Sequence, residues 1–365
     1  MIRVFIVDDS AVVRQKLSDD LNRFSDIEVV GTAIDPYVAR DKIVRLDPDV
    51  ITLDVEMPRM DGLTFLKKIM RYFPKPVIIV SSLTKEGGKL ALEALEYGAV
   101  EVMSKPGGSF SVGEISTRLA QLIRASSKAS IKKKQQYQFK HEDKESGKTA
   151  SADEVTDHQK NRKKPVSANA SSENLIAIGA STGGTEAIRQ VLSDLPGDSP
   201  GVLIVQHMPP KFTTAFAERL NESCNLEVRE AKDGDRVRLG TALVAPGNYH
   251  MLLKKSGKDF YVRVKYGPLV RHHRPSVDML FSSVAKEANT NSVVVLLTGM
   301  GVDGAEGMRD LHQYGATTIA QDENSCVVFG MPKEAIRMRA VDYVEDINNI
   351  GNKIINLFKE KEKAE

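Results

Sequence analysis

Apolar runs and amphipathic stretches alternate along the first third of this chain. Five runs have the length of buried strands: Val4–Val7, Glu28–Ala33, Val50–Leu53, Val77–Val80 and Ala99–Met103. The stretches between them repeat apolar residues at helical spacing. Five alternating strand and helix units predict a doubly wound α/β domain around a parallel sheet, whose ligands bind beyond the carboxyl ends of the strands.

The amphipathic stretches also carry signals for where helices begin and end. In the first stretch, one helical face collects the apolar residues Val13, Leu17, Leu21 and Phe24. Asp35 followed by Pro36 predicts a capped helix start with a proline in the first turn, and Gly98 predicts a helix end. These signals support the assignment of helices between the strands.

A second α/β pattern occupies residues 173–365. The apolar run Leu175–Ala180 ends in Ser181 and a glycine-rich turn, and a helical pattern follows. Two further apolar runs precede His207 and Asp303, so both residues are expected at strand ends. The pattern predicts a second α/β domain with a mainly parallel sheet.

Residues 126–172 separate the two patterns and differ from both in composition. Lys, Ser, Gln and Ala dominate, Lys and Arg outnumber Asp and Glu, and aliphatic residues are scarce. Such a segment cannot bury enough apolar surface to order itself, which predicts a flexible basic linker between domains at 1–125 and 173–365. A nucleic-acid arm is the alternative. The flanking domains are together acidic, however, so we expect no nucleic-acid binding.

Composition predicts where the protein works. The chain is 41% hydrophobic and 27% charged, and its apolar runs fall short of the ~20 positions of a membrane helix. Asp8 and Asp9 interrupt the first apolar run, so no signal peptide is expected. Cys224 and Cys326 lie far apart, without metal or redox spacing. We expect a cytoplasmic monomer with no membrane insertion.

Polar residues follow four of the five predicted strands in the first domain. Asp8 and Asp9 follow the first strand, Asp54 the third, Ser81 the fourth and Lys105 the fifth. Three carboxylates on one edge repel each other unless a cation neutralises them, and oxygen ligands with room for water suit Mg²⁺. A carboxylate beside that ion can attack a phosphoryl donor, while Lys105 and Ser81 contact the new phosphate. Each residue alone is an ordinary loop residue, but together they predict a phosphoryl-transfer site.

Ser181, His207 and Asp303 combine a hydroxyl, a base and a carboxylate. A serine at a strand-to-helix turn is a nucleophile when a histidine accepts its proton and a carboxylate orients that histidine. The same glycine-rich turn can instead cradle a phosphate at the helix N-terminus, or merely permit a tight turn. The residues alone leave these possibilities open.

Other hydroxyl and imidazole groups compete for these roles. Thr182 is a second hydroxyl beside Ser181, but its branched side chain suits packing better than attack. His250, His272 and His273 follow no apolar run, which makes them weaker candidates for the base. Of these, His250 is expected to be a hydrogen-bonded loop residue.

The motifs FIVDDS, ITLDVEMPRMDG, VIIVSSLT and SKPG resemble those of response-regulator receiver domains, over about residues 1–125. By this resemblance Asp54 is the phosphoacceptor. Asp8 and Asp9 resemble the acidic pair that holds the metal together with Asp54 and the main-chain carbonyl of Glu56.

The resemblance also assigns the residues that respond to phosphorylation. Ser81 resembles the switch hydroxyl, and Lys105 resembles the lysine that contacts the phosphate. Val102 stands where many receivers carry an aromatic residue that rotates on activation. An aromatic switch is therefore not expected in this chain.

The motifs GASTGG, QHMP, VAPGNYHM, TGMGVDG and FGMP resemble the catalytic domain of the chemotaxis protein-glutamate methylesterases, over nearly the whole second domain. The order of receiver, linker and esterase matches as well. By position Ser181, His207 and Asp303 resemble the catalytic triad of the family. The resemblance points to the main-chain N–H of Met300 as an oxyanion donor, and the turn at Thr182 is a neighbour able to supply a second one.

Together the resemblances imply a methylesterase that is regulated by phosphorylation. They imply chemotaxis receptors as substrates, with glutamyl methyl esters converted to glutamate and methanol and specific glutamines deamidated. They imply a chemotaxis histidine kinase as phosphodonor, Mg²⁺ in the receiver, and no cofactor for the esterase reaction. The alternative is a non-catalytic response regulator whose second domain binds a nucleotide or a partner protein.

Overall fold

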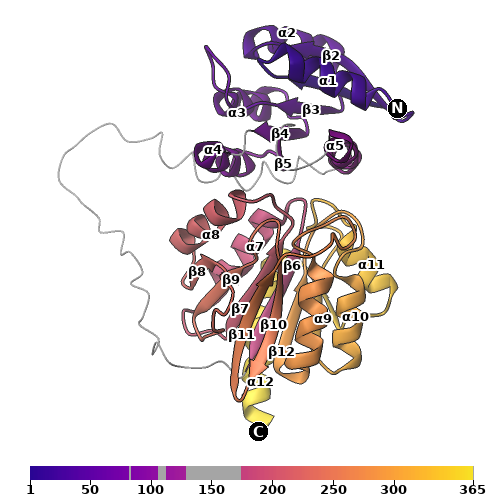
Figure 1. Cartoon of the computed structure of the whole chain (residues 1–365). Coiled ribbons are helices and arrows are strands. Elements are labelled where there is room, and N and C mark those ends of the chain that lie inside the picture. Colours follow the sequence, from indigo (N-terminus) through magenta and orange to yellow (C-terminus); the bar gives the residue numbers. More distant parts are fainter. Residues whose placement is uncertain (82–83, 106–111, 129–173, 365) are drawn as a thin grey trace, which may run out of the picture. The chain divides into compact units, whose positions relative to one another are not determined.

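The computed structural model describes residues 1–81, 84–105, 112–128 and 174–364. The chain divides into an N-terminal and a C-terminal unit, each built on its own parallel sheet (Figure 1). All but the first three residues of the predicted linker, 126–172, lie outside the described residues, and the domain boundaries remain predictions. Within the described ranges, no helix combines the length and the apolar character needed to cross a bilayer.

The N-terminal unit is a five-stranded parallel sheet with the order β2-β1-β3-β4-β5. This is the predicted doubly wound α/β fold, and its strand order reverses between β1 and β3, where such sheets open a ligand site. Its strands are β1 (Ile2–Val7), β2 (Ile27–Ala33), β3 (Val50–Leu53), β4 (Val77–Ser81) and β5 (Glu101–Ser104). Its helices are α1 (Ala11–Leu21), α2 (Pro36–Leu46), α3 (Gly62–Tyr72), α4 (Lys85–Glu96) and α5 (Val112–Ser126).

The helix signals read from the sequence are confirmed with one exception. Asp35 caps α2, and its side chain accepts two main-chain N–H bonds from the first turn. Gly98 follows α4 with a left-handed φ of 103°. The prediction that Phe24 belongs to the first helix is wrong, because α1 ends at Leu21. Phe24 packs on the core from the turn beyond the helix.

The C-terminal unit has a seven-stranded parallel sheet with the order β14-β13-β12-β6-β7-β9-β8, plus an antiparallel hairpin of β10 and β11. The predicted mainly parallel α/β sheet is thus confirmed. Its strands are β6 (Leu175–Ala180), β7 (Gly201–Gln206), β8 (Glu227–Glu230), β9 (Thr241–Val244), β10 (His250–Ser256), β11 (Asp259–Lys265), β12 (Ser292–Leu296), β13 (Thr317–Gln321) and β14 (Tyr343–Glu345). Its helices are α7 (Gly184–Asp194), α8 (Phe212–Ser223), α9 (Val277–Glu287), the 3-10 turn η1 (Asn289–Asn291), α10 (Ala305–Gln313), α11 (Met331–Arg337) and α12 (Ile347–Ala364).

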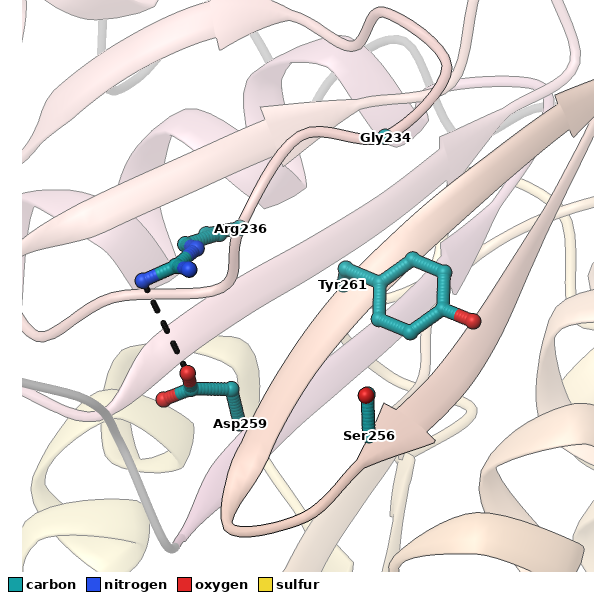
Figure 2. A pocket seen from close by; sticks show the side chains of 5 residues that line it. All are labelled: Gly234, Arg236, Ser256, Asp259 and Tyr261. Carbon is teal, nitrogen blue, oxygen red and sulfur yellow. Dashed lines mark ion pairs between the residues drawn. The ribbon is translucent and has the colours of Figure 1, made fainter.

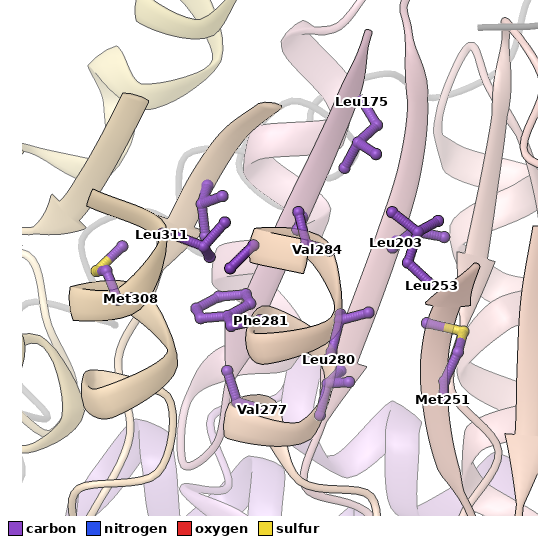
Figure 3. Close-up of a cluster of buried hydrophobic side chains, with 14 of the residues drawn as sticks. Leu175, Leu203, Met251, Leu253, Val277, Leu280, Phe281, Val284, Met308 and Leu311 are labelled. Carbon is purple, nitrogen blue, oxygen red and sulfur yellow. The ribbon is translucent and has the colours of Figure 1, made fainter. Parts of the chain in front are cut away.

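One core of the C-terminal unit joins the sheet to α9, α10 and the β10–β11 hairpin. Figure 3 shows Phe281 of α9 among side chains from several of these elements, with Leu175 and Leu203 supplied by the strands. Every residue of β6, β7 and β12 is buried, so these strands read as continuous apolar runs. The central strands are therefore rigidly held, and the loops at their carboxyl ends are well placed to position a site.

Candidate active site

Ser181 lies at the tight turn between β6 and α7. Its main-chain N–H donates to the Thr298 carbonyl at 3.0 Å, and its own carbonyl accepts from the Gly184 N–H at 2.7 Å. Gly183 has a left-handed φ of 77°, and a Cβ on it would lie 2.6 Å from the Val327 side chain. Glycine meets both conditions, which explains how this turn holds Ser181 at the head of a helix.

His207 follows directly on β7, as predicted. Its N–H donates to the Ala180 carbonyl at 3.1 Å, which sets it beside the turn of Ser181. Its side chain is 2% exposed, and its Nε2 lies 2.8 Å from Asp303 Oδ2. Because an ionised carboxylate only accepts, Nε2 carries the ring proton of the neutral imidazole. Nδ1 is buried and has no hydrogen-bond partner among the described residues, so its lone pair is available.

Asp303 does not lie at the end of a strand, contrary to the prediction. Strand β12 ends at Leu296, and Asp303 lies in the loop that leads to α10. From there its carboxylate reaches the N-terminus of α9. It accepts bonds from Ser276 Oγ at 2.8 Å and from the N–H groups of Val277 and Asp278 at 2.7 and 3.0 Å. A helix N-terminus stabilises negative charge, so this location favours the ionised carboxylate.

Two neighbouring carboxylates at this helix end have opposite pKa shifts. Burial by itself would raise the pKa of Asp303, but the hydrogen bond of His207, its positive charge when the ring is protonated, and the N–H groups of α9 hold that pKa well below its usual range. Burial raises the pKa of Asp278, despite its bonds with the Gly307 N–H and the Arg271 guanidinium. Asp303 is thus the carboxylate suited to stabilise a charged imidazolium.

The two predicted oxyanion donors lie on segments that touch Ser181. The carbonyl of Thr182 accepts a bond from Thr298 Oγ1 at 2.9 Å, which ties the two turns together. Gly299 precedes Met300, and a Cβ on Gly299 would lie 2.8 Å from the Ser181 Cβ. Only a glycine permits so close an approach. The role of these N–H groups as oxyanion donors remains a prediction.

The other histidines of this region have different environments. His250 is buried at the start of β10, and its expected place in a loop is wrong. Its Nε2 lies 2.9 Å from a main-chain carbonyl, and its Nδ1 accepts from the Ser276 N–H at 3.2 Å, so it is hydrogen-bonded as expected. His272 is exposed. His273 stacks on the His207 ring, a contact that the sequence did not predict.

Potential metal ligands also meet at this site. His207, His273 and Asp303 each offer one possible ligand atom, and these three atoms lie within 4.8 Å of one another. The two imidazole rings are parallel, however, with 7° between their planes and 3.7 Å between their centroids. A nitrogen lone pair lies in its ring plane, so parallel rings direct their lone pairs past any single ion. The arrangement does not fit a metal held by both rings.

The strand-end residues of the N-terminal unit also meet, at the carboxyl edge of its sheet. Carboxylate oxygens of Asp8, Asp9 and Asp54 lie within 4.8 Å of one another. Lys105 Nζ lies 2.7 Å from Asp54 Oδ2 and 3.2 Å from Asp8 Oδ2. The Glu56 N–H donates to Asp54 Oδ1 at 3.1 Å. Three carboxylates beside one ammonium leave a negative, oxygen-rich cluster, which fits a divalent cation such as Mg²⁺.

Asp54, Ser81 and Val102 of this unit have different environments. Burial raises the pKa of Asp54 to about 6, although Lys105 opposes the shift. Ser81 is the last residue of β4 and is fully buried. Its Oγ lies 3.5 Å from the Gly87 carbonyl oxygen, which is a weak hydrogen bond that a better acceptor would replace. Val102 is buried within β5. The structure thus brings the acidic residues and Lys105 together, and the Lys105 N–H donates to the Ser81 carbonyl at 2.8 Å. The roles of all these residues remain predictions.

A separate hollow of about 250 Å³ lies beside the β10–β11 hairpin (Figure 2). It is lined by Gly234, Arg236, Ser256, Asp259 and Tyr261. An exposed ion pair with an N–O distance of 3.6 Å joins Arg236 to Asp259 across it. It contains none of the predicted site residues, so we assign it no part in the chemistry.

The sequence did not identify two residues that support the triad. Ser276 caps α9 through a bond with the Met279 N–H while donating to Asp303. Its place before an apolar helical pattern is a helix-start signal, which reveals the cap but not the contact with Asp303. His273 lies in an irregular loop and carries no such signal.

Comparison with known proteins identifies both units. Residues 4–116 match the family model of the response regulator receiver domain, and residues 176–354 match that of CheB methylesterase. A Syntrophus aciditrophicus protein named protein-glutamate methylesterase/protein-glutamine glutaminase 2 is 55% identical over 98% of this chain and 99% of its own. The Escherichia coli O157:H7 protein-glutamate methylesterase/protein-glutamine glutaminase is 50% identical over 97% of this chain and 96% of its own.

A solved structure agrees with these matches. The crystal structure of the Thermotoga maritima CheB methylesterase catalytic domain is 38% identical, with a TM-score of 0.50, and covers 50% of this chain and 98% of its own. The identity to the full-length relatives extends over both units. This chain therefore belongs to the CheB methylesterase family and carries a response regulator receiver domain.

Proposed function

We propose that this protein hydrolyses glutamyl methyl esters on chemotaxis receptors, releasing methanol, and also deamidates selected receptor glutamines. The observation that carries the proposal is the buried His207–Asp303 pair, held at 2.8 Å beside the turn that presents Ser181. The names of its full-length relatives support an enzymatic function and give no support to the alternative of a non-catalytic output domain. The buried thiols of Cys224 and Cys326 suit the reducing cytoplasm, where we place the reaction.

The first half of the reaction forms an acyl-enzyme. Nδ1 of His207 accepts the proton of the Ser181 hydroxyl as its Oγ bonds to the γ-carbonyl carbon of the ester. Asp303 accepts the Nε2 proton and stabilises the imidazolium. The familiar serine proteases use the opposite ring nitrogens for these two contacts. The main-chain N–H groups of Met300 and Thr182 are the proposed donors to the oxyanion.

The second half returns the free enzyme. The tetrahedral intermediate collapses, and His207 gives its proton to the departing methoxy oxygen, so that methanol leaves. Water then attacks the acyl carbon, and His207 takes one of its protons. Collapse of the second intermediate breaks the bond to Ser181 Oγ, which receives that proton from His207 as glutamate is released. With a glutamine substrate, ammonia leaves in place of methanol. That reaction is expected to be slower, because an amide carbonyl is less electrophilic.

We further propose that a chemotaxis histidine kinase, or a small phosphodonor, phosphorylates Asp54. Asp8, Asp9, Asp54 and the main-chain carbonyl of Glu56 would hold Mg²⁺. When bound, the ion offsets the negative charge of the cluster and of the phosphoryl oxygens. Lys105, 2.7 Å from Asp54 Oδ2, is placed to contact a phosphoryl group on that carboxylate.

Methanol release from methylated receptor membranes tests the esterase proposal. Ser181→Ala and His207→Ala should each lower kcat by roughly 10⁴-fold or more, with folding intact. Ser193→Ala is a matched control, because its hydroxyl donates to the Arg189 carbonyl within α7 and is not expected to affect the rate. An organophosphonate should label the wild type and not Ser181→Ala. Near-normal methanol release by Ser181→Ala would refute the assignment.

A further inference from the structure

The His273 ring lies flat against the ring proposed as the general base. The His207 and His273 centroids are 3.7 Å apart, and the ring planes differ by 7°. This separation is van der Waals contact between two planar groups, with no room for water between them. The other identified contact on the His207 ring is the hydrogen bond of Nε2 to Asp303, at the edge of the ring.

The loop between β11 and α9 is built to hold His273 in this position. Val270 and His273 exchange two main-chain hydrogen bonds of 3.0 and 2.9 Å. The next residue, Arg274, is also held. Its guanidinium donates twice to Asn248 Oδ1, at 3.0 and 2.6 Å, and lies over the Tyr266 ring, 4.1 Å from the ring centroid. The chain then enters α9, whose cap contacts Asp303. One short segment therefore supplies both Ser276, a hydrogen-bond donor to Asp303, and the His273 ring that covers His207.

The stack restricts a motion that the hydrogen bond alone leaves open. A bond at one edge is compatible with tilting of the His207 ring about its Cβ–Cγ bond, and tilting changes the direction in which Nδ1 points. That rotation sweeps the ring through the volume that His273 occupies. The flat contact also places a π face against the positive charge that His207 gains when it takes the serine proton.

We propose that His273 is a positioning residue, which keeps the His207 ring in the plane that directs Nδ1 at Ser181. The proposal rests on the esterase function assigned above and adds the reason why the base needs a second aromatic ring. It requires only the planar face of His273, so a phenyl ring should substitute for the imidazole.

Steady-state methanol release with three variants tests this role. His273→Ala should lower kcat by about 10- to 100-fold, since a displacement of about 1 Å in a catalytic group costs that much. KM should stay within about twofold, because the substrate contacts are unchanged. His273→Phe should recover most of the loss. His272→Asn is the matched control, because it changes the neighbouring exposed imidazole to a residue that tolerates the left-handed φ of 67° at that position.

Imidazole ¹⁵N spectra of the full chain provide a readout independent of turnover. At a pH where the His207 ring is neutral, the wild type and His273→Phe should show Nε2 as its protonated nitrogen, whereas His273→Ala should show exchange-broadened or mixed signals. An unchanged kcat and His207 spectrum in His273→Ala would overturn the proposal, and so would failure of His273→Phe to recover activity. If instead the wild type released no methanol, the esterase assignment would fail while the spectra still decided whether His273 holds the ring.

Discussion

At the scale of single residues, two buried aspartates show how the surroundings of a carboxyl group can shift its pKa in opposite directions. Asp303 and Asp54 are each 1% exposed. Asp303 accepts bonds from four donors, and its pKa lies below the usual range. For Asp54 burial dominates, the neighbouring Asp8 adds repulsion, and the pKa rises to about 6. The first carboxylate is stable as a permanent charge, whereas the second is costly to ionise without a further cation beside it.

Asp303→Asn should damage both catalysis and stability. The amide cannot fix the His207 tautomer as a carboxylate does, so kcat should fall by roughly 10³- to 10⁴-fold. The folded pKa of Asp303 is depressed, so its ionisation stabilises the native state fully above the ordinary pKa of about 3.9 and less as the pH falls below it. Urea unfolding should show a wild-type advantage that narrows as the pH falls below about 4. A gap that widens in acid would contradict this account.

The Cys326 thiol should be unreactive in the native protein. Burial raises its pKa far above that of a free thiol, and the nearby Asp322 charge adds to the shift, so almost no thiolate forms at pH 8. In a Cys224→Ala variant, where Cys326 is the remaining thiol, a disulfide reagent should label slowly when folded and stoichiometrically in denaturant. Fast labelling of the folded variant would show that the site opens to solvent.

At the scale of elements, the N-terminus of α9 joins helix capping to catalysis. Ser276 satisfies the Met279 N–H and donates to Asp303 with the same hydroxyl. The apolar runs predicted β1 to β6 to within two residues at each end, because an uninterrupted apolar run marks a strand that is buried over most of its length. They failed for Asp303 and His273. Those residues reach the site through loops whose paths depend on packing between distant segments, and such loops have no periodicity to read.

Ser276→Ala should therefore lower stability and rate together. Loss of the cap costs about 1 kcal/mol, and Asp303 loses one of its donors. We expect a lower thermal midpoint and a kcat reduced about 3- to 30-fold, well short of the Ser181→Ala loss, because the two N–H donors from α9 remain. Ser223→Ala is the comparison, since its hydroxyl bonds the Arg219 carbonyl at the end of α8. A normal rate in Ser276→Ala despite lower stability would separate capping from catalysis.

At the scale of the whole molecule, a phosphate-accepting unit and a hydrolytic unit share one chain. The predicted linker, residues 126–172, would keep the receiver at a high effective concentration near the esterase without fixing its orientation. A receiver joined in this way is most simply explained as a regulator. Changing esterase activity 10- to 100-fold requires a difference of about 1.4–2.8 kcal/mol between two states, which a few charge-assisted bonds to a phosphoryl group can supply.

Asp54→Asn tests this regulation. The variant should keep basal methanol release and lose stimulation by acetyl phosphate with Mg²⁺, because the amide cannot accept the phosphoryl group. Asp41→Asn is the control, since Asp41 is exposed on α2 and pairs with Arg40, so stimulation should persist. Full stimulation of Asp54→Asn would leave the receiver as a docking module without a switch.

The strand order of the C-terminal sheet has a consequence for biosynthesis. Strand β6 lies between β7 and β12, but β12 begins about 110 residues after β6 ends. At about 5–20 residues per second, a ribosome needs roughly 6–20 s to make that stretch. During that interval one side of an entirely apolar strand has no partner, which is the condition that favours wrong pairing between nascent chains. We therefore expect the unfinished chain to depend on chaperones, and slower translation past β7 should lower the yield of active enzyme.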